Sequence, residues 1–458
     1  MNDRKTILFI SSRSDIAGGE NYLLSVMRHL DRRRFEPLVL LPGIGKFSAA
    51  LQSLSVATEI IEVDYSSITQ QQPWYKLMEG TDRRIKRIIE IIRMNDVRLV
   101  HTNSNKIIDG AFAARFAGIP HLYLAHIEYQ PNMPIFERVP LQPATFAELM
   151  GGLSAGIVAV SEGVAQALCP PLTRDRVRVI HNGLEIDRLD QAAEGSRTLR
   201  EEMGLDDKSL LVTAVGRIHP DKGFDNLLAA AAQAIRHQSI NAHIMIVGAE
   251  DDRRYAALLR GQARELGIEP NVHFLGFRED VPRILSQTNV FVLSSRREGH
   301  PYALLEAMAS GCASVATRCN GVEDTVMDGK TALLVNIDDV TGMANGIARL
   351  AQDDKLRGEL ARAARADIRS RFAAQTCVES LMAVYDDILV SPRPLASSVG
   401  IDLFLRAVHE IGDLGLKVVE LEQRVRQVEH LTRWVRQSPI YRSARQVNRW
   451  IRGAADEG

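Results

Sequence analysis

The chain has 458 residues, of which 45% are hydrophobic and 25% charged, and its formal net charge is −1. This length predicts two domains of roughly 200 residues each, and the balanced charge excludes nucleic-acid binding through overall charge. The four cysteines form no CxxC or Cys/His cluster, which argues against zinc and disulfides and indicates a reducing compartment. No apolar run of about 18 residues occurs. We therefore expect a cytoplasmic protein, with a peripheral position on the inner membrane face as the alternative.

Short apolar runs rich in β-branched residues alternate with amphipathic helical patterns along most of the chain. The first seven runs are "TILFISS", "EPLVLLP", "TEIIEVD", "VRLVHTN", "HLYLAHI", "GIVAVSE" and "RVRVIHN". After the polar interval "DQAAEGSRTLREEMGLDDKS" come "LLVTAVG", "AHIMIVG", "VHFLGF", "NVFVLSS", "ASVATR" and "ALLV". This alternation is typical of βαβ units with mainly parallel sheets. It predicts an α/β fold of two Rossmann-like, doubly wound domains facing a cleft, with the ligand at the carboxyl ends of the strands.

The first candidate binding element is "SDIAGGENYLLSVMRHL", which follows the first predicted strand. Gly18 and Gly19 let the backbone approach a ligand closely, and a helix expected from about Glu20 directs free N–H groups towards it. Such a turn suits a phosphate group. The alternative is a tight strand-to-helix turn with no ligand.

The second element is "VGRIHPDKGFDNLL", after the first strand of the second predicted domain. Arg217 and Lys222 lie five residues apart, beside Gly216 and before a helix. Arginine offers a bidentate fork and lysine a point charge, so together they can hold a diphosphate. The alternative is a solvated basic turn.

The third element is "RREGHPYALLEAMASG", a turn and a helix that Gly311 ends. Glu298 lies on the turn, within reach of a sugar ring, whereas Glu306 lies on the helix, where a carboxylate can accept two ribose hydroxyls. The residues between them are expected to line the same donor space through their backbone: Gly299, His300, Pro301 and Tyr302. Pro301 has no N–H and fits a helix start. The alternative is a pair of solvated surface charges.

These stretches together resemble a known family. "EGHPYALLEAMASG", "VGRIHPDKG", "AGGENYLL", "VIHNGLEIDRL" and "VAVSEGVAQAL" are similar to motifs of the retaining nucleotide-sugar glycosyltransferases of family 4, which have the GT-B architecture. The similarity runs from about residue 5 to residue 390. It implies a hexosyltransferase that moves a sugar from a nucleotide diphosphate sugar to an acceptor hydroxyl with retention at the anomeric carbon. It also implies a glycan or lipid-linked acceptor in cell-surface polysaccharide or lipid-linked glycan synthesis.

The resemblance also implies roles for individual residues. Glu306 would bind the nucleotide ribose and Glu298 the donor sugar. Arg217 and Lys222 would neutralise the diphosphate leaving group, which Gly18 and Gly19 approach from the other domain.

The resemblance implies that His126, in "GIPHLYLAHIE", is the histidine of the catalytic site. His101, in "VRLVHTNSN", is expected to be a structural hydrogen-bonding residue, with a place on the acceptor side as the alternative. Two residues depart from the family pattern. His300 stands where an aromatic or aliphatic residue is usual, and Glu128 stands where an aspartate or another residue is often found. The departure at His300 bears on the polarity of the sugar pocket, and the departure at Glu128 bears on the contact with the acceptor.

The domain boundaries follow from the pattern and the resemblance. Residues 1–185 form a Rossmann-like acceptor domain and residues 186–372 a Rossmann-like nucleotide-sugar domain. Residues 373–390 form a helix that returns to the first domain, and residues 391–458 a helical, basic tail.

No Asp-X-Asp triplet occurs in the chain, so a metal clamp for the diphosphate has no obvious ligands. We expect no cofactor and no metal, with the leaving group stabilised by the chain's own cations and helix N-termini. The expected reaction is a front-face attack in which the leaving-group oxygen assists deprotonation. The alternatives are a nucleotide-sugar epimerase or phosphorylase of the same architecture, or an inactive GT-B scaffold; a phosphorylase would need a lysine for pyridoxal phosphate, and no lysine has that setting.

The tail after "SPRPLASS" has its own pattern. An apolar seam comprises Ile411, Leu414, Val418, Leu421, Val425 and Val428. Between Arg424 and Arg452 eight arginines stand against one acidic residue, Glu429, interleaved with Trp434, Ile440, Tyr441, Val447, Trp450 and Ile451. This predicts an amphipathic segment on an anionic membrane and a homodimer through the seam. The alternative is a solvated coiled coil, or a tail packed on the catalytic domains.

Overall fold

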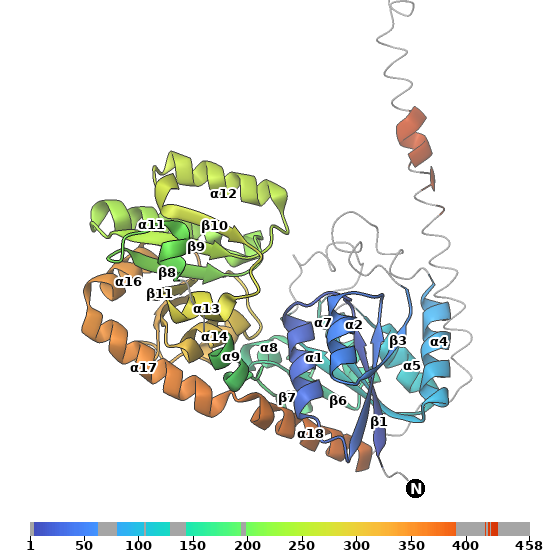
Figure 1. Ribbon diagram of the computed structural model, residues 1–458. Helices are drawn as coiled ribbons and strands as arrows, with labels where there is room; N and C mark the ends of the chain where they lie inside the picture. Colours follow the sequence, from blue (N-terminus) through green and yellow to red (C-terminus); the bar gives the residue numbers. More distant parts are fainter. Residues whose placement is uncertain are drawn as a thin grey trace, which may run out of the picture.

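In a computed structural model of the protein, two lobes lie side by side, each built around a parallel sheet (Figure 1). The structure describes residues 4–62, 80–104, 107–128, 143–193 and 198–390 and, in the tail, residues 417, 420–421 and 423–428. The "SPRPLASS" linker, the seam residues Ile411, Leu414 and Val418, and the arginine-rich segment after Glu429 lie outside the described residues.

The N-terminal lobe has a seven-stranded sheet in the order β3-β2-β1-β4-β5-β6-β7. The strands are β1 Lys5–Ser11, β2 Phe35–Leu41, β3 Ala57–Ile60, β4 Val97–Asn103, β5 His121–Ala125, β6 Gly156–Ala159 and β7 Val177–Val179. The helices are α1 Gly18–His29, α2 Lys46–Ser53, α4 Thr81–Met94, α5 Asp109–Ala117, α7 Pro143–Leu153, α8 Glu162–Ala167 and the 3-10 helix η2 Arg174–Arg176. Neighbouring strands are parallel throughout, as in the register Leu8↔Leu38 between β1 and β2.

The C-terminal lobe has a six-stranded parallel sheet in the order β10-β9-β8-β11-β12-β13. The strands are β8 Leu210–Val215, β9 Ala242–Val247, β10 Val272–Gly276, β11 Val290–Leu293, β12 Ala313–Thr317 and β13 Leu333–Val335. The helices before and within the sheet are α9 Ile186–Ala192, α10 Leu199–Met203, η3 Pro220–Lys222, α11 Phe224–His237, α12 Arg253–Glu265, η4 Glu269–Asn271, α13 Val281–Ser286, α14 Tyr302–Ser310 and α15 Asn320–Glu323. Three helices follow: α16 Val340–Gln352, α17 Asp354–Arg371 and α18 Ala374–Val390.

The chain crosses between the lobes twice, and the two crossings pair with each other. Leu184 N donates to Phe372 O at 2.7 Å, and Ala374 N donates to Leu184 O at 2.9 Å. Gly183 is needed there because a Cβ on it would lie 2.6 Å from the Cα of Ala374. Helix α17 on the C-terminal lobe ends just before this crossing, and α18 begins just after it and runs beneath the N-terminal lobe (Figure 1).

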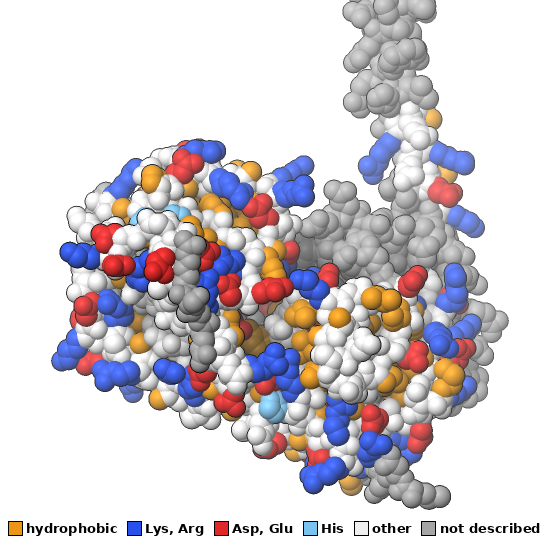
Figure 2. Space-filling model, viewed as in Figure 1, with side chains coloured by type: hydrophobic (Ala, Val, Ile, Leu, Met, Phe, Trp, Pro, Cys, Tyr) orange, Lys and Arg blue, Asp and Glu red, His pale blue; other side chains and the backbone are white. Residues whose placement is uncertain are grey.

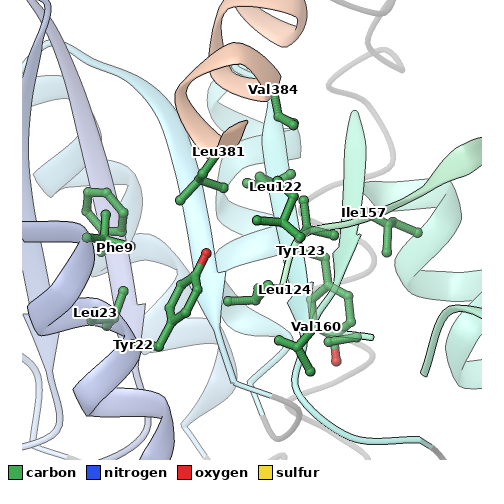
Figure 3. Packing of buried hydrophobic residues seen from close by; sticks show 14 of the residues in the cluster. Phe9, Tyr22, Leu23, Leu122, Tyr123, Leu124, Ile157, Val160, Leu381 and Val384 are labelled. Carbon is green, nitrogen blue, oxygen red and sulfur yellow. The ribbon is translucent and has the colours of Figure 1, made fainter. Parts of the chain in front are cut away.

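Helix α18 is part of the N-terminal core. Leu381, Val384 and Tyr385 are buried in the same cluster as Phe9 of β1 and Tyr22 of α1 (Figure 3). Each leucine or valine buried in this way removes apolar surface worth roughly 1.5–3 kcal/mol from water. The C-terminal helix therefore ties the second lobe to the first.

The predicted fold is confirmed, because each of the thirteen apolar runs overlaps a strand of one of the two parallel sheets. Two local details differ from the expectation. Helix α1 begins at Gly18 rather than about Glu20, since the Glu20 carboxylate accepts from Ala17 N at 3.2 Å and closes the first turn. The polar interval between the lobes contains the end of helix α9 and the short helix α10.

Candidate active site

The two lobes are separated by a furrow, which the space-filling view shows as a hollow in the surface (Figure 2). Residues that follow the carboxyl ends of strands in both sheets meet there, since His126 after β5 touches Gly299 after β11. On the C-terminal lobe, Lys222 and Glu298 form an ion pair with Nζ 2.7 Å from Oε1. The side chains are only 22% and 11% exposed, and Ser295 Oγ donates to the same Glu298 oxygen at 2.7 Å. An ammonium group has three hydrogens, so Lys222 can hold Glu298 and still donate to a phosphate oxygen.

The neighbourhood of Lys222 is built to place its amine. A Cβ on Gly216 would lie 3.4 Å from three carbons of the Lys222 side chain, so this glycine makes room for the aliphatic stem. Gly223 follows with φ +61°, and a Cβ there would lie 2.1 Å from Ser294 O. Ser294 Oγ donates to Lys222 O at 2.8 Å. The end of β11 therefore fixes both the Lys222 backbone and Glu298.

Arg217 is placed differently from Lys222. It forms an ion pair with Asp251, and its side chain is 54% exposed. In the described part of the chain no hydrogen bond or ion pair joins it to Lys222 or Glu298. Because exposed ion pairs contribute little, a bound anion can compete with Asp251 for this guanidinium.

Glu306 lies on α14, half-buried, and burial raises the pKa of its carboxyl to about 7. Tyr302, one turn earlier on the same helix, lies at the boundary of the lobes, since a Cβ on Gly18 would be 4.0 Å from Tyr302 Cδ2. Helix α14 begins after Pro301 and ends at Ser310, and it is followed by Gly311, which has φ +86°. Glu306 is thus a carboxyl group whose ionised form is destabilised by burial, one turn after the residue of α14 that meets Gly18.

His300 does not face this space with its side chain. It is buried, its Nδ1 accepts from Asn182 N at 3.2 Å, and its carbonyl oxygen accepts from Asn182 Nδ2 at 2.8 Å. Its ring packs 5.1 Å from that of Phe372, and burial lowers its pKa to about 3. The His300 side chain, which departs from the family pattern, therefore packs against the segments that cross between the lobes.

His126 lies at the end of β5 on the N-terminal lobe. Its Nε2 is 2.7 Å from Asn103 Oδ1, its ring meets that of Tyr22 edge-on at 5.6 Å, and burial lowers its pKa to about 4. Gly19 packs against the same pair, since a Cβ on it would lie 3.7 Å from His126 Nε2. His101 is fully buried and bonded through Nδ1 to Tyr385 OH at 2.7 Å, in the structural position expected of it.

The lobes touch through their backbones beside this histidine. A Cβ on Gly299 would lie 1.6 Å from His126 O, so any side chain at this position would collide with the other lobe. Gly321 stacks behind it, since a Cβ there would lie 1.8 Å from Gly299 O. Asn320 donates to the Glu128 carboxylate across the same gap, and burial raises the pKa of Glu128. The contact brings His126 next to the Glu298 loop.

Sequence reasoning missed three residues that organise this site: Asn103, Asn182 and Asn320. Their partners lie 84, 118 and 192 positions away along the chain. The one available signal was that Asn103 ends a predicted strand at the ligand edge of the sheet. In the described ranges no group of three or more His, Cys, Asp or Glu could hold a metal ion.

Two family models match the chain. "Glycosyltransferase Family 4" matches residues 16–188 and "Glycosyl transferases group 1" matches residues 209–353, so the two matches follow the two lobes. The chain belongs to the glycosyltransferases. It has the GT-B architecture of two Rossmann-like lobes, as the resemblance implied.

Several characterised relatives are transferases. The chain is 25% identical over 308 residues to the UDP-Gal:alpha-D-GlcNAc-diphosphoundecaprenol alpha-1,3-galactosyltransferase of Escherichia coli, covering 66% of this chain and 79% of that protein. It is 26% identical to the N-acetyl-alpha-D-glucosaminyl L-malate synthase of Bacillus anthracis, covering 42% of this chain and 49% of that one. It is 32% identical to the D-inositol 3-phosphate glycosyltransferase of Corynebacterium jeikeium, covering 46% and 52%. The chain thus spans about half the length of the last two.

Solved structures share the fold. Anabaena HepE in complex with UDP and glucose has a TM-score of 0.70 at 22% identity, over 84% of this chain and 100% of that one. A glycosyltransferase from Rickettsia africae has a TM-score of 0.71 at 18% identity, over 85% and 100%. Within the described residues of our protein, no helix is long and apolar enough to cross a membrane.

Proposed function

We propose that the protein transfers a hexose from a UDP-sugar to an acceptor hydroxyl with retention at the anomeric carbon. The observation that carries this is the Lys222–Glu298 ion pair, 2.7 Å long, held beside the Gly299–His126 contact between the lobes. In this proposal Lys222 is the cation for the departing phosphate and Glu298 the carboxylate for the sugar, and both lie beside a histidine of the other lobe. UDP is preferred as the nucleotide because HepE was solved with it and the E. coli relative uses UDP-Gal.

Each residue has a chemical task in this proposal. Lys222 and Arg217 meet the negative charge that develops on the diphosphate, with Gly18 and Gly19 at the start of α1 approaching it from the other side. Glu306 accepts hydroxyls of the ribose, and Glu298 accepts hydroxyls of the sugar. Because the cations are covalent parts of the chain, the reaction is proposed to need no metal ion.

Retention is proposed through front-face attack. The departing diphosphate oxygen takes the acceptor proton while the acceptor oxygen bonds to the anomeric carbon on the same face. No carboxylate has to form a covalent intermediate, so Glu298 acts in binding and charge stabilisation rather than as a nucleophile.

The acceptor is proposed to be a glycan or lipid-linked saccharide, because the E. coli relative acts on a diphosphoundecaprenol-linked sugar. The tail would bring the enzyme to an anionic membrane as a homodimer. In its described part Leu421 and Val425 of the seam are 60% and 56% exposed, so they are accessible to a second copy. Flotation with anionic liposomes, comparing the full chain with one ending at Val390, tests the membrane role; equal binding by both would contradict it.

The function is tested by incubating the protein with a panel of UDP-sugars and lipid-linked acceptors and recording products by NMR. The expected result is an α-linked product from an α-linked donor, formed equally well in EDTA. Interconversion of the donor sugars without acceptor would instead show an epimerase. An activity lost in EDTA and restored by Mn²⁺ would contradict the metal-independent mechanism.

A further inference from the structure

The loop that follows β11 holds the turn that carries Lys222. In the 3-10 helix η3, three successive carbonyl oxygens each accept a hydrogen bond from this loop. Arg296 Nη1 donates to Pro220 O at 2.7 Å, Arg296 N donates to Asp221 O at 2.8 Å, and Ser294 Oγ donates to Lys222 O at 2.8 Å. Carbonyl groups at a helix end lack partners within the helix, so the loop satisfies them.

The Arg296 side chain also binds the helix that follows the turn. Its Nη1 and Nη2 donate to the two carboxylate oxygens of Asp225, in the first turn of α11, at 3.0 and 2.7 Å. Its Nε donates to Asp338 Oδ1, just before α16, at 2.7 Å. A bidentate contact of this kind fixes the direction of the guanidinium as well as its distance. One side chain therefore joins four segments: its own loop, η3, α11 and the residues before α16.

Asp225 is held from a further side as well. Tyr255 OH on α12 donates to Asp225 Oδ1 at 2.6 Å and accepts from Asp225 N at 3.2 Å. Burial raises the pKa of Asp225, but the hydrogen bonds from Arg296 and Tyr255 outweigh burial, and the pKa is lowered. The carboxylate therefore stays ionised and needs its positive partner, because removing one member of a partly buried ion pair leaves an uncompensated charge.

The contacts of Arg296 distinguish it from a cation that binds phosphate. They use four of the five N–H donors of the guanidinium. Asp225 and Asp338 bring two negative charges against one positive charge, so the group as a whole does not attract an anion. A contribution of Arg296 to the site must therefore come from where it places the neighbouring turn.

We propose that Arg296 is a positioning residue that fixes the turn of Lys222 against the loop of Glu298, so that the amine and the carboxylate act on the donor as one unit. The contacts made by Ser294 Oγ and Arg296 N would remain without the guanidinium, whereas those to Pro220 O and α11 would be lost. Contact with the diphosphate rests on the proposed function, whereas the fixed position of the turn does not.

The test compares two arginines of the same lobe. Arg296→Met keeps most of the side-chain volume and removes every donor of the guanidinium. Arg278→Met is the matched control, because Arg278 makes a bidentate contact to Asp280 and a contact to Glu202 at 2.6 Å. The Arg278 side chain is 21% exposed, compared with 29% for Arg296. Both variants lose a guanidinium that joins two carboxylates, but of the two arginines it is Arg296 that contacts η3.

Calorimetric titration with UDP and steady-state kinetics measure the effect on the site. Arg296→Met is expected to weaken UDP binding and raise the donor KM on the order of tenfold, with the acceptor KM unchanged, whereas Arg278→Met changes none of these. In a Lys222→Met background, Arg296→Met is expected to change UDP binding by less than about twofold, because residues that act as one unit are not additive. An equal loss in both backgrounds, or a fall in kcat with the donor KM unchanged, would contradict the proposal.

Hydrogen exchange of the full chain gives a readout that needs no ligand. The amides of Lys222 and Gly223 donate to carbonyl oxygens within the turn at 2.9 and 3.1 Å. Arg296→Met is expected to speed the exchange of these two amides by about tenfold or more, because the turn opens more often when its outer contacts are lost. Arg278→Met is expected to leave their exchange unchanged.

A second variant keeps the test decisive. Should Arg296→Met fail to fold, Arg296→Met combined with Asp225→Asn replaces it, since the asparagine removes the uncompensated carboxylate. If the unmodified protein neither binds UDP nor transfers a sugar, the proposed function fails, while hydrogen exchange still decides whether Arg296 holds the turn. Exchange in the turn that is the same with and without the guanidinium would overturn the proposal.

Discussion

The two lobes have the same architecture but bring different chemistry to the furrow between them. The C-terminal lobe brings charge, with Lys222 and Glu298 paired at 2.7 Å and Glu306 on the following helix. Among its described residues, the N-terminal lobe brings the neutral side chains of Asn103 and His126, together with Glu128, whose pKa is raised by burial. A shared fold therefore does not determine the role of a lobe; the residues at its strand ends do. In this account the charged lobe binds the donor and the neutral lobe orients what reacts with it.

The largest loss of activity is expected when the contact between the two lobes is disrupted. Gly299→Ala places a Cβ 1.6 Å from His126 O, against backbone that cannot move aside as a flexible side chain would. We expect kcat/KM to fall at least about 100-fold, because a displacement of about 1 Å at a reacting centre costs that much. UDP affinity should change far less, since the charged groups belong to one lobe.

The matched control for this variant is Gly261→Ala on α12. A Cβ at Gly261 meets nothing within 4 Å, so this change should leave transfer unaffected. Steady-state kinetics and UDP titration of both variants check the prediction, and a fully active Gly299→Ala enzyme would contradict the contact.

The second prediction separates the two carboxylates of the charged lobe. Glu306→Ala should raise the donor KM more than Glu298→Ala does, because a ribose contact is equal in the ground and transition states. Glu298→Ala should instead lower kcat, by about 100-fold, since a sugar contact strengthens as the ring flattens. Glu269→Ala, on an exposed carboxylate of the same lobe, is the control. Equal effects of both variants on KM alone would count against these roles.

The third prediction concerns the cost of keeping Glu306 in the site. Its folded pKa of about 7 lies above the usual 4.5, so the folded chain holds an extra proton between these values. Stability therefore falls as pH rises from about 4.5 to about 7, by up to about 3 kcal/mol. Glu306→Gln should raise Tm at about pH 8 and leave it nearly unchanged at about pH 5. Calorimetry at both pH values decides, and an equal shift at both would refute the desolvation cost.

The smallest effect is expected at the outer contact between the lobes. Lys46 of α2 lies 3.3 Å from Glu279 Oε1 and over the ring of Phe277, but the charged side chains are 65% and 79% exposed. A double-mutant cycle of Lys46→Ala and Glu279→Ala on kcat/KM should give a coupling below about 1 kcal/mol. It should shrink further at high salt. A large coupling would mean that this outer pair, rather than Gly299, holds the lobes together.

The fold could be predicted from the sequence because parallel strands buried on both faces leave continuous apolar runs. Runs such as "LLVTAVG" and "AHIMIVG" correspond to β8 and β9 almost residue for residue. The first residue of α1 was harder to predict, because the contact between Glu20 and Ala17 N lets the helix begin at the glycines. Local spacing does not reveal such a side-chain contact to the preceding loop.

The site could be predicted only in part. Lys222 and Glu298 were both identified from their own segments, but their pairing across 76 positions is visible only in the structure. The link between Asn103 and His126 likewise depends on the neighbouring order of β4 and β5. For His300 the position on the loop before α14 was predicted, but the contact of its side chain with Asn182 was not. Single-sequence patterns report local chemistry, and tertiary contacts decide how it is used.

The most direct test of the division between the lobes is calorimetric titration of UDP into the unmodified protein, Glu306→Ala and His126→Ala. We predict that Glu306→Ala weakens UDP binding by about tenfold or more, whereas His126→Ala binds UDP within about twofold of the unmodified protein and loses sugar transfer. A His126→Ala variant that weakens UDP binding as much as Glu306→Ala does would contradict the account.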